Sequence, residues 1–273
     1  YRPELSAHRC LGGRVCGELF LMSTIPKDLH DLLISLNGKG YKSYKTLQEK
    51  SFQFPPFTLC FEHIQGDPFA APSRLSLSTK LSKIGFSPTF YDTPIKKLAL
   101  EDHLLRVIHK KISTLKGRST GSGRSGEIAI QSPSQKVILR SGIKIKNDSI
   151  KVVLFVGLPG NGRSVLAQEC IRLFSELLPF MWEESLLANS LDLKQIQNSI
   201  KILEDYFALR NALHKKDRIA FIADGSHNPR ASGISDLPLK KNCIAFLSPY
   251  GLRAEVDLPH KGKVSGMPVP KGI

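Results

Sequence analysis

The sequence predicts a mixed α+β fold built from short strands and amphipathic helices. Apolar residues recur at helical spacing in some stretches and alternate with polar residues in others. In addition, the Asn147-Asp148 turn joins two strand-like runs, which favours antiparallel pairing. With 273 residues, of which 41% are hydrophobic, the chain can form one large domain or two smaller ones.

The first half of the chain contains two predicted helices and two predicted strands. Residues 1–26 show no clear period, so we expect a disordered or targeting tail there. Helical spacing of apolar residues predicts helices over 28–36 and 94–112, and Asn37-Gly38 ends the first of them. Residues 57–64 and 74–81 have strand patterns, and we expect these two strands to pair antiparallel.

The second half begins with strands and changes to helices. A Gly/Ser loop over 116–126 precedes the predicted strands, which lie at 127–132, 137–140, 142–146 and 149–156. Helical spacing then predicts helices over 164–178 and 192–214. Three later apolar runs predict strands at 218–223, 243–247 and 252–258.

The formal net charge of +15 is concentrated in one region. Residues 104–151 contain 11 Lys or Arg and two acidic residues, so their charge is 11 − 2 = +9. Such a cluster indicates a polyanionic partner such as RNA, although a solvated basic surface has the same composition. The candidate nucleic-acid contacts are Arg118, Arg124, Lys144 and Lys146.

Basic and aromatic residues are interleaved in GKGYKSYKTL, residues 38–47. Tyr41 and Tyr44 could stack on a base while the neighbouring lysines contact phosphate. In the alternative interpretation, the two rings pack in the core and the lysines stay in solvent.

The segment GLPGNGRS, residues 157–164, matches the phosphate-binding P-loop except at one position. Arg163 stands where the P-loop has Lys, and its planar guanidinium does not replace a compact ammonium group. Pro159 also removes one N–H group from the cradle. A working loop would bind phosphate at Gly162 and Arg163, as in a small-molecule kinase or NTPase. The alternative is a tight strand-to-helix turn without a catalytic role.

The kinase alternative has two structural requirements. Residues 151–156 must form a central parallel strand, and Asp224 must lie beside the Gly162 turn to bind Mg²⁺. The predicted hairpin at Asn147-Asp148 argues against this arrangement, because it gives that strand an antiparallel partner.

A second Gly-rich loop, residues 121–126, is a candidate phosphate site. Successive N–H groups at Gly121, Gly123, Arg124 and Ser125 can form an anion-binding nest. This loop precedes a strand, so it lacks the contribution of a helix dipole. A mobile linker is the alternative interpretation.

Other site types have no support in the sequence. The five cysteines form no C-x-x-C pair, so we expect no disulfide framework, no metal site and an intracellular location, in the cytoplasm or an organelle. No apolar run approaches the roughly 18 residues that a membrane helix needs. We assign no catalytic residue in these 273 residues.

Six segments, taken together and in order, carry a family resemblance. They are LNGKGYKSYK (36–45), FEHIQGDPFAAPSR (61–74), GSGRSGEIAI (121–130), VGLPGNGRSV (156–165), FIADGSHNPRASGISDLPL (221–239) and VSGMPVPKGI (264–273). In these segments the chain resembles the predicted ATPases of the ABC class.

The resemblance implies an N-terminal α+β domain followed by the start of an ABC-type ATPase domain. The family's P-loop lies beyond VSGMPVPKGI, so the resemblance implies a chain truncated before that loop. We expect a basic N-terminal domain over 27–178 and a partial ATPase domain over 179–273. By the same comparison, GLPGNGRS is a structural turn and Asp224 is not the Mg²⁺-binding acid.

The resemblance also bears on activity and partners. It implies that the intact protein binds and hydrolyses ATP with Mg²⁺, whereas we expect these 273 residues to be inactive alone. RNA binding and a homodimer are further properties that the family admits.

Overall fold

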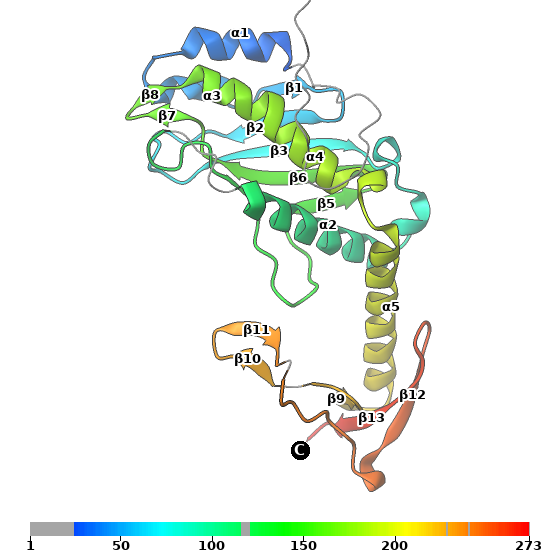
Figure 1. Cartoon of the computed structure of the whole chain (residues 1–273). Helices are drawn as coiled ribbons and strands as arrows, with labels where there is room; N and C mark the ends of the chain where they lie inside the picture. Colours follow the sequence, from blue (N-terminus) through cyan, green and yellow to red (C-terminus); the bar gives the residue numbers. More distant parts are fainter. Residues whose placement is uncertain (1–24, 116–120, 228, 240, 273) are drawn as a thin grey trace, which may run out of the picture.

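The computed structural model describes residues 25–115, 121–227, 229–239 and 241–272. Within these residues, a larger part contains a six-stranded sheet and a smaller part contains a three-stranded sheet (Figure 1). The long helix α5 (Leu193–Lys215) joins the two parts. The α+β class predicted from the sequence is confirmed.

The larger sheet is antiparallel between all of its paired strands. The strand order is β1-β2-β3-β6-β4, and β5 shares one edge of β6 with β4. The strands are β1 (Ser51–Gln53), β2 (Thr58–His63), β3 (Ser73–Lys80), β4 (Ile128–Ala129), β5 (Ile143–Lys146) and β6 (Ser149–Val156). The predicted hairpin at Asn147-Asp148 joins β5 to β6, and Asn147 adopts a left-handed φ of 53°, which Asn tolerates.

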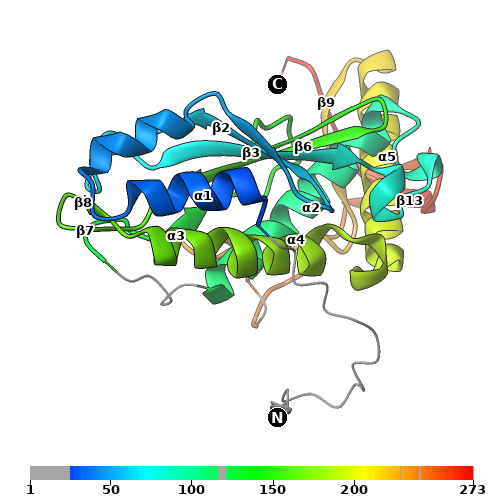
Figure 2. The ribbon, with the colours of Figure 1, turned by 90° about the horizontal axis from the view of Figure 1, so that it is seen from above.

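One face of this sheet forms the hydrophobic core. Alternate residues such as Leu59, Phe61 and Leu154 point into it and are fully buried. The helices that cover this face are α1 (Lys27–Leu36), α2 (Pro94–Leu115), α3 (Ala167–Arg172) and α4 (Leu178–Leu186) (Figure 2). Aromatic ring contacts connect the sheet to the helices. The ring centroids of Phe61 and Phe174 are 5.5 Å apart, and those of Phe57 and Trp182 are 4.8 Å apart. Burying each such aromatic side chain contributes about 2 kcal/mol.

The opposite face of the sheet is partly exposed. On β6 the side chains of Lys151, Val153 and Phe155 alternate with the buried ones and remain exposed or half-buried. The larger part also contains short 3₁₀ helices at Tyr41–Leu47, Ser82–Ile84, Pro88–Phe90 and Ala188–Ser190.

The strand predicted at 137–140 is wrong. Residues 130–142 run without a strand, and the Arg140 side chain fixes this segment instead. Its guanidinium donates to Asp102 Oδ1 at 2.5 Å and to the Lys136 carbonyl at 2.6 Å. The three consecutive apolar residues Val137, Ile138 and Leu139 are exposed and form no strand.

The helix predicted at 164–178 begins later and extends further. Residues Ser164–Val165 form strand β8, and α3 starts at Ala167. A π-helical turn at Leu173–Leu177 connects α3 to α4, which continues to Leu186. The strand predicted at 127–132 is also reduced to the two residues of β4.

The smaller part packs on the second half of α5. Its sheet has the order β12-β13-β9, with β9 (Arg218–Ala223), β12 (Ala254–Leu258) and β13 (Gly262–Pro270). The Asp205 carboxylate of α5 accepts hydrogen bonds from the N–H groups of His260 and Lys261, at 2.8 and 3.0 Å. A separate hairpin consists of β10 (Arg230–Ser232) and β11 (Ser235–Pro238), and a 3₁₀ helix lies at Tyr250–Leu252.

The structure of this part differs from the sequence prediction at two strands. The strand predicted at 243–247 is absent from the described residues, and only isolated hydrogen bonds tie Phe246 to residues 225 and 226. Strand β13 was not predicted, because Pro268 and Pro270 argue against a strand. These prolines are tolerated because β12 pairs with β13 only up to Gly266, and beyond it no described strand pairs with that edge of β13.

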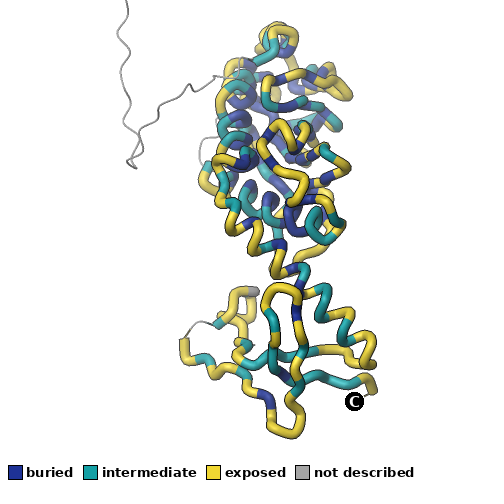
Figure 3. Tube along the Cα trace, turned by 90° about the vertical axis from the view of Figure 1, so that its right-hand side faces the viewer, coloured by how far each residue is buried: buried dark blue, intermediate teal, exposed yellow. Residues whose placement is uncertain are grey.

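Exposure differs strongly between the two parts (Figure 3). Most buried residues lie in the larger part, whereas several apolar side chains of the smaller part, such as Ile234, Ile244 and Tyr250, are almost fully exposed. In the described part of the chain, no helix is both long and apolar enough to cross a membrane.

Candidate functional site

Four of the six segments that carry the family resemblance meet at one end of the larger sheet. We call this region the loop cluster and define it as residues 37–44, 66–70, 121–126 and 157–166. Backbone hydrogen bonds hold it together: Gly38 donates to the Val165 carbonyl at 3.0 Å, and Ser122 donates to the Gly160 carbonyl at 2.8 Å. Residues distant in sequence are thereby brought side by side.

The segment that resembles a P-loop forms a β-hairpin. Strands β7 (Gly160–Asn161) and β8 (Ser164–Val165) pair antiparallel around Gly162 and Arg163. Gly162 has a φ of 56°, as the first central residue of a tight hairpin turn requires. The sequence predicted a direct strand-to-helix turn, and that prediction is wrong, since this hairpin separates β6 from α3.

The helix N-terminus that a P-loop would aim at phosphate is also occupied. The Ala167 N–H, in the first turn of α3, donates to the Asn37 side-chain oxygen at 3.1 Å. The N–H groups of Gly157, Gly160 and Gly162 donate to Glu127 O, Ser125 Oγ and Ser122 Oγ. These residues therefore do not fit a phosphate cradle, which needs N–H groups directed at the ligand.

The two requirements of the kinase alternative are not met either. Strand β6, which contains residues 151–156, is antiparallel to all of its described neighbours. Asp224 belongs to the smaller part, where it accepts hydrogen bonds from the Ser248 N–H at 2.6 Å and the Ser265 hydroxyl at 2.8 Å. These hydrogen bonds lower the pKa of Asp224, and those from Ser248 make the largest contribution.

Tyr41 and Tyr44 anchor the loop cluster to the core. Both rings are buried, and they contact each other edge to face with centroids 5.1 Å apart. The Tyr41 hydroxyl donates to the Leu158 carbonyl at 2.8 Å, and the Tyr44 hydroxyl donates to the Pro159 carbonyl at 2.7 Å. Burial raises the pKa of both hydroxyls. The core interpretation of GKGYKSYKTL is confirmed, and Lys39, Lys42 and Lys45 remain exposed.

The Gly-rich loop at 121–126 packs against the same hairpin. A side chain at Gly121 would collide with the Gly160 carbonyl, and one at Gly123 would meet the Pro68 carbonyl. The N–H groups of Arg124 and Ser125 donate to the carbonyls of Pro68 and Ser122, at 3.1 and 3.2 Å. The glycines of this loop thus allow close backbone packing, and several of its N–H groups have partners within the protein.

The outer surface of the loop cluster is basic and carries one aromatic ring. Arg124 and Arg163 are exposed, and the Arg163 side chain is 87% accessible and lies 3.5 Å from the Asp67 carboxylate. Phe69 is 68% exposed although it follows a well-ordered turn, in which its N–H donates to the Asp67 carboxylate at 3.0 Å. The structure therefore brings together the predicted residues Gly121, Gly123, Arg124, Ser125, Gly162 and Arg163. Phe69 was missed, because an apolar residue in a turn has no distinctive sequence signal.

The other predicted contacts lie on the partly exposed face of the larger sheet. Lys144 of β5 pairs in register with Lys151 of β6, so their side chains share this face. We call the basic residues of this face the basic sheet face: Arg74, Lys80, Lys144, Lys146 and Lys151. Arg118 lies outside the described residues.

One carboxylate neutralises part of the basic sheet face. Glu62 contacts Lys151 at 2.6 Å and Arg74 at 2.9 Å. Burial alone would raise the pKa of Glu62, but the hydrogen bonds from Lys151 and Ser76 and the charge of Arg74 lower it below its ordinary value. Lys144 and Lys146 form no ion pair with any described residue, so their charges are available to a partner.

Comparison with protein families gives two consecutive matches. Residues 26–189 match the model described as "ATPase of the ABC class N-terminal", and residues 192–273 match the P-loop domain of the ABC ATPases. No curated protein matches the chain. The first match alone covers more than half of the 273 residues, and it includes all four segments of the loop cluster. The chain therefore belongs to the family of ABC-class ATPases.

Proposed function

We propose that the intact protein binds and hydrolyses ATP with Mg²⁺. The observation that supports this most directly is the pair of family matches, which together span nearly all of the chain from residue 26. The P-loop domain supplies nucleotide binding in this class, and Mg²⁺ neutralises the phosphate charge during hydrolysis.

We further propose that these 273 residues alone do not turn over ATP. The sequence contains no G-x-x-x-x-G-K-[ST], and the similar segment at 157–164 is a hairpin. The purified chain should show no Mg²⁺-dependent phosphate release above a buffer control. Hydrolysis that Arg163→Ala abolishes and Lys110→Ala preserves would overturn the proposal and make the hairpin a nucleotide site.

The domain division is part of the same proposal. The sequence predicts a tail at 1–26, a basic N-terminal domain at 27–178 and an ATPase domain from 179 onward, and we propose the same order with the boundary moved to the end of α4. The family models meet slightly later, between 189 and 192, and the contact of Trp182 with Phe57 supports including α4 in the first domain. Limited proteolysis tests the division, since the first accessible cleavage after α4 marks the boundary.

We propose RNA binding as a second function, located on the basic sheet face and at Arg124. The supporting observation is the adjacent pair Lys144 and Lys151, flanked by Lys146, on a sheet face that is partly exposed. Cations in such a row can follow the phosphates of a single strand, and Phe69 beside Arg124 offers a ring for base stacking.

A salt titration tests RNA binding. Binding of a single-stranded oligoribonucleotide should weaken as salt rises, and replacing both Lys144 and Lys146 by Ala should reduce the slope of log K against log salt by about 1.4. The matched double variant at Lys194 and Lys201, which are exposed on α5, should keep the original slope. Affinity that does not depend on salt would contradict the proposal.

A homodimer of the intact protein is the remaining element of the proposal. The exposed apolar side chains of the smaller part support it, because such surfaces are usually covered by other protein.

A further inference from the structure

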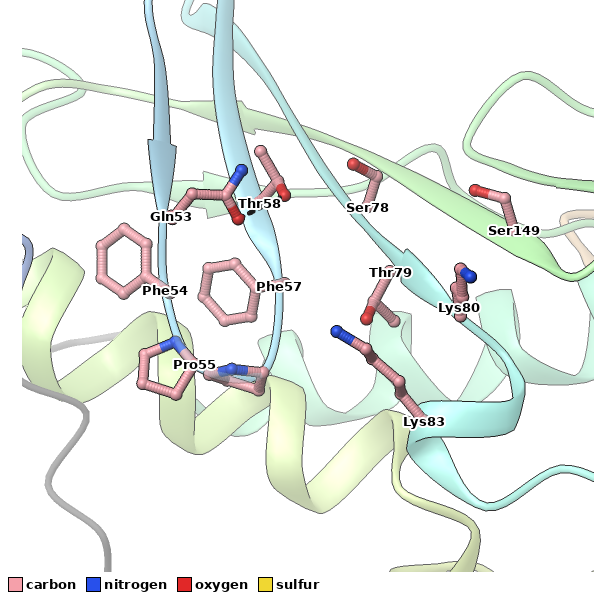
Figure 4. A pocket seen from close by; sticks show the side chains of 11 residues that line it. Gln53, Phe54, Pro55, Phe57, Thr58, Ser78, Thr79, Lys80, Lys83 and Ser149 are labelled. Atoms are coloured by element: carbon pink, nitrogen blue, oxygen red, sulfur yellow. Dashed lines mark hydrogen bonds between the residues drawn. The ribbon is translucent and has the colours of Figure 1, made fainter.

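A polar pocket of about 260 Å³ lies at the end of the larger sheet where β1 turns into β2 (Figure 4). One wall is the turn at residues 54–57, in which Phe54 and Phe57 exchange two backbone hydrogen bonds and their rings stack 5.0 Å apart. Pro55 and Pro56 form the tip of this turn. The wall is therefore rigid, since both prolines have fixed φ angles.

The facing wall supplies hydrogen-bond donors. It consists of the last residues of β3, the first residue of β6 and the 3₁₀ helix Ser82–Ile84. The polar side chains that line the pocket are Gln53, Thr58, Ser78, Thr79, Lys80, Lys83 and Ser149. The Thr58 hydroxyl donates to the side-chain Oε1 of Gln53 at 2.9 Å, which leaves the side-chain NH₂ of Gln53 as a donor.

The charge of the pocket is positive. Of the described residues that line it, two are lysines and none is acidic. Among the described residues, neither Lys80 nor Lys83 forms an ion pair or a side-chain hydrogen bond. In Figure 4 the Lys83 amine points toward the 55–57 turn, into the space between the two walls.

Asp148 lies beside this wall and interacts with the charge of Lys80, which helps to lower the Asp148 pKa, but it forms no ion pair with Lys80 or Lys83. Asp148 accepts hydrogen bonds from the Ser82 N–H and hydroxyl, at 3.0 and 2.7 Å, and from the Tyr91 hydroxyl at 2.9 Å. This carboxylate thus fixes the 3₁₀ helix that carries Lys83, and it does so through neutral donors. Neither ammonium group is in direct contact with a carboxylate of the described residues, so both can contact an external anion.

We propose that this pocket binds a phosphate group, carried either by a small phosphorylated molecule or by an RNA backbone. Ammonium, amide and hydroxyl donors around one space, without a carboxylate, favour a multiply charged oxyanion. The volume lies just below the range of typical ligand pockets, which suits a phosphate with a sugar-sized attachment better than a whole nucleotide. The assignment does not depend on the proposed RNA binding by Lys144 and Lys146.

Register connects the pocket to the basic sheet face. Lys80 pairs with Ser149, and Ser149 pairs with Lys146, so the three side chains form one row across the sheet. A strand of RNA on that face could place one phosphate in the pocket, whereas a small molecule would occupy the pocket alone. The two sources of phosphate can be separated by experiment.

The test is an NMR titration of the full 273-residue chain that follows the amides of residues 78–83. Three probes are used: inorganic phosphate, ribose 5-phosphate and an oligouridylate without terminal phosphates. Lys83→Ala should weaken binding of the effective probe about tenfold, the loss expected for one charge-assisted hydrogen bond. Lys110→Ala, which removes an exposed lysine of α2, is the matched control and should leave the affinity unchanged.

The outcomes are distinct. Binding of phosphate or ribose 5-phosphate that depends on Lys83 supports a small phosphorylated ligand, even if the oligouridylate fails to bind anywhere. Binding of the oligouridylate alone, weakened by Lys83→Ala, supports an RNA phosphate. No perturbation by any probe, or equal affinities in the two variants, overturns the assignment. Should Lys83→Ala lose its circular dichroism signal, Lys83→Gln replaces it.

Discussion

At Gly157 the backbone leaves β6 and meets the 121–126 loop with no side chain between them. Gly157 donates to the Glu127 carbonyl at 2.9 Å and accepts from the Gly126 N–H at 2.8 Å. A Cβ atom at this position would collide with the Arg124 carbonyl. The glycine is required for this close approach, and a P-loop function is not needed to explain it.

We therefore expect Gly157→Ala to destabilise the protein by about 2 kcal/mol or more, because the colliding atom belongs to the backbone and cannot rotate away. Urea denaturation measures the loss. Gly66→Ala is the matched control, since a Cβ there meets nothing within 4 Å and should change stability by less than about 0.5 kcal/mol. Equal effects of the two substitutions would contradict the packing account.

Asp148 makes stability depend on acid pH. The hydrogen bonds from Ser82, followed by that from Tyr91, lower its pKa below the ordinary 3.8. The ionised carboxylate therefore stabilises the fold above pH 3.8, and this stabilisation is lost as the pH falls through the lowered folded value. Between pH 6 and pH 3, the urea midpoint of Asp148→Asn should fall less than that of the wild type. The urea midpoint of the control variant Asp257→Asn, at an exposed position, should fall as much as that of the wild type. An equally large fall for Asp148→Asn would refute the linkage between Asp148 and stability.

The roles of Tyr41 and Tyr44 could not be predicted from the neighbouring sequence. Tyr41 and Tyr44 alternate with lysines, and that pattern suits either base stacking or core packing. Their hydroxyls bond carbonyls at residues 158 and 159, more than 100 positions away. The two tyrosine rings are buried because of partners that are distant in the sequence. The sequence pattern around residues 41–44 contains no information about those partners.

Helices with a strong apolar periodicity could be predicted from the sequence. Elements that depend on a single side chain or on the edge of a sheet could not. Helices α2 and α5 follow apolar spacing over more than five turns, and α5 starts one residue after the predicted first residue, Asp192, which is its N-cap. The β7–β8 hairpin was hidden, because its glycines also satisfy P-loop spacing. Strand β13 was hidden by prolines that are harmless only where β12 no longer pairs with it.

The segment at 130–142 depends on an ion pair with α2. Asp102 and Arg140 are 5% and 7% exposed at their side chains, and Arg106 also contacts Asp102 at 2.6 Å. Asp102→Ala would leave the buried guanidinium without a carboxylate, so we expect a loss of about 3 kcal/mol or more and faster proteolysis of this segment. Asp92→Ala, which breaks the exposed pair with Lys96, should cost less than about 1 kcal/mol. Similar losses in both variants would argue against a role for burial.

At the scale of the whole molecule, the most exposed apolar side chains lie in the smaller part. Ile234, Ile244 and Tyr250 are the most exposed of these side chains. We expect the chain to bind the dye ANS and to associate as its concentration rises, in sedimentation experiments. Replacing Ile244 and Tyr250 by Ser should reduce both effects, whereas Leu139→Ser, in the larger part, should not. A discrete dimer would support the proposed homodimer, and a monomer without dye binding would contradict the expectation.

Helix α5 has a mechanical consequence for the molecule. It is continuous over 23 residues, or about 35 Å. Its first half contacts α2, where Ser199 lies 2.9 Å from His103, and its second half holds the β12–β13 turn through Asp205. One rigid rod is thus embedded in both parts, in place of a flexible hinge. Because α5 is packed against both α2 and the smaller sheet, a rotation of the smaller sheet would tilt α5 and displace α2. Movement of the smaller part would in this way be transmitted to the larger part.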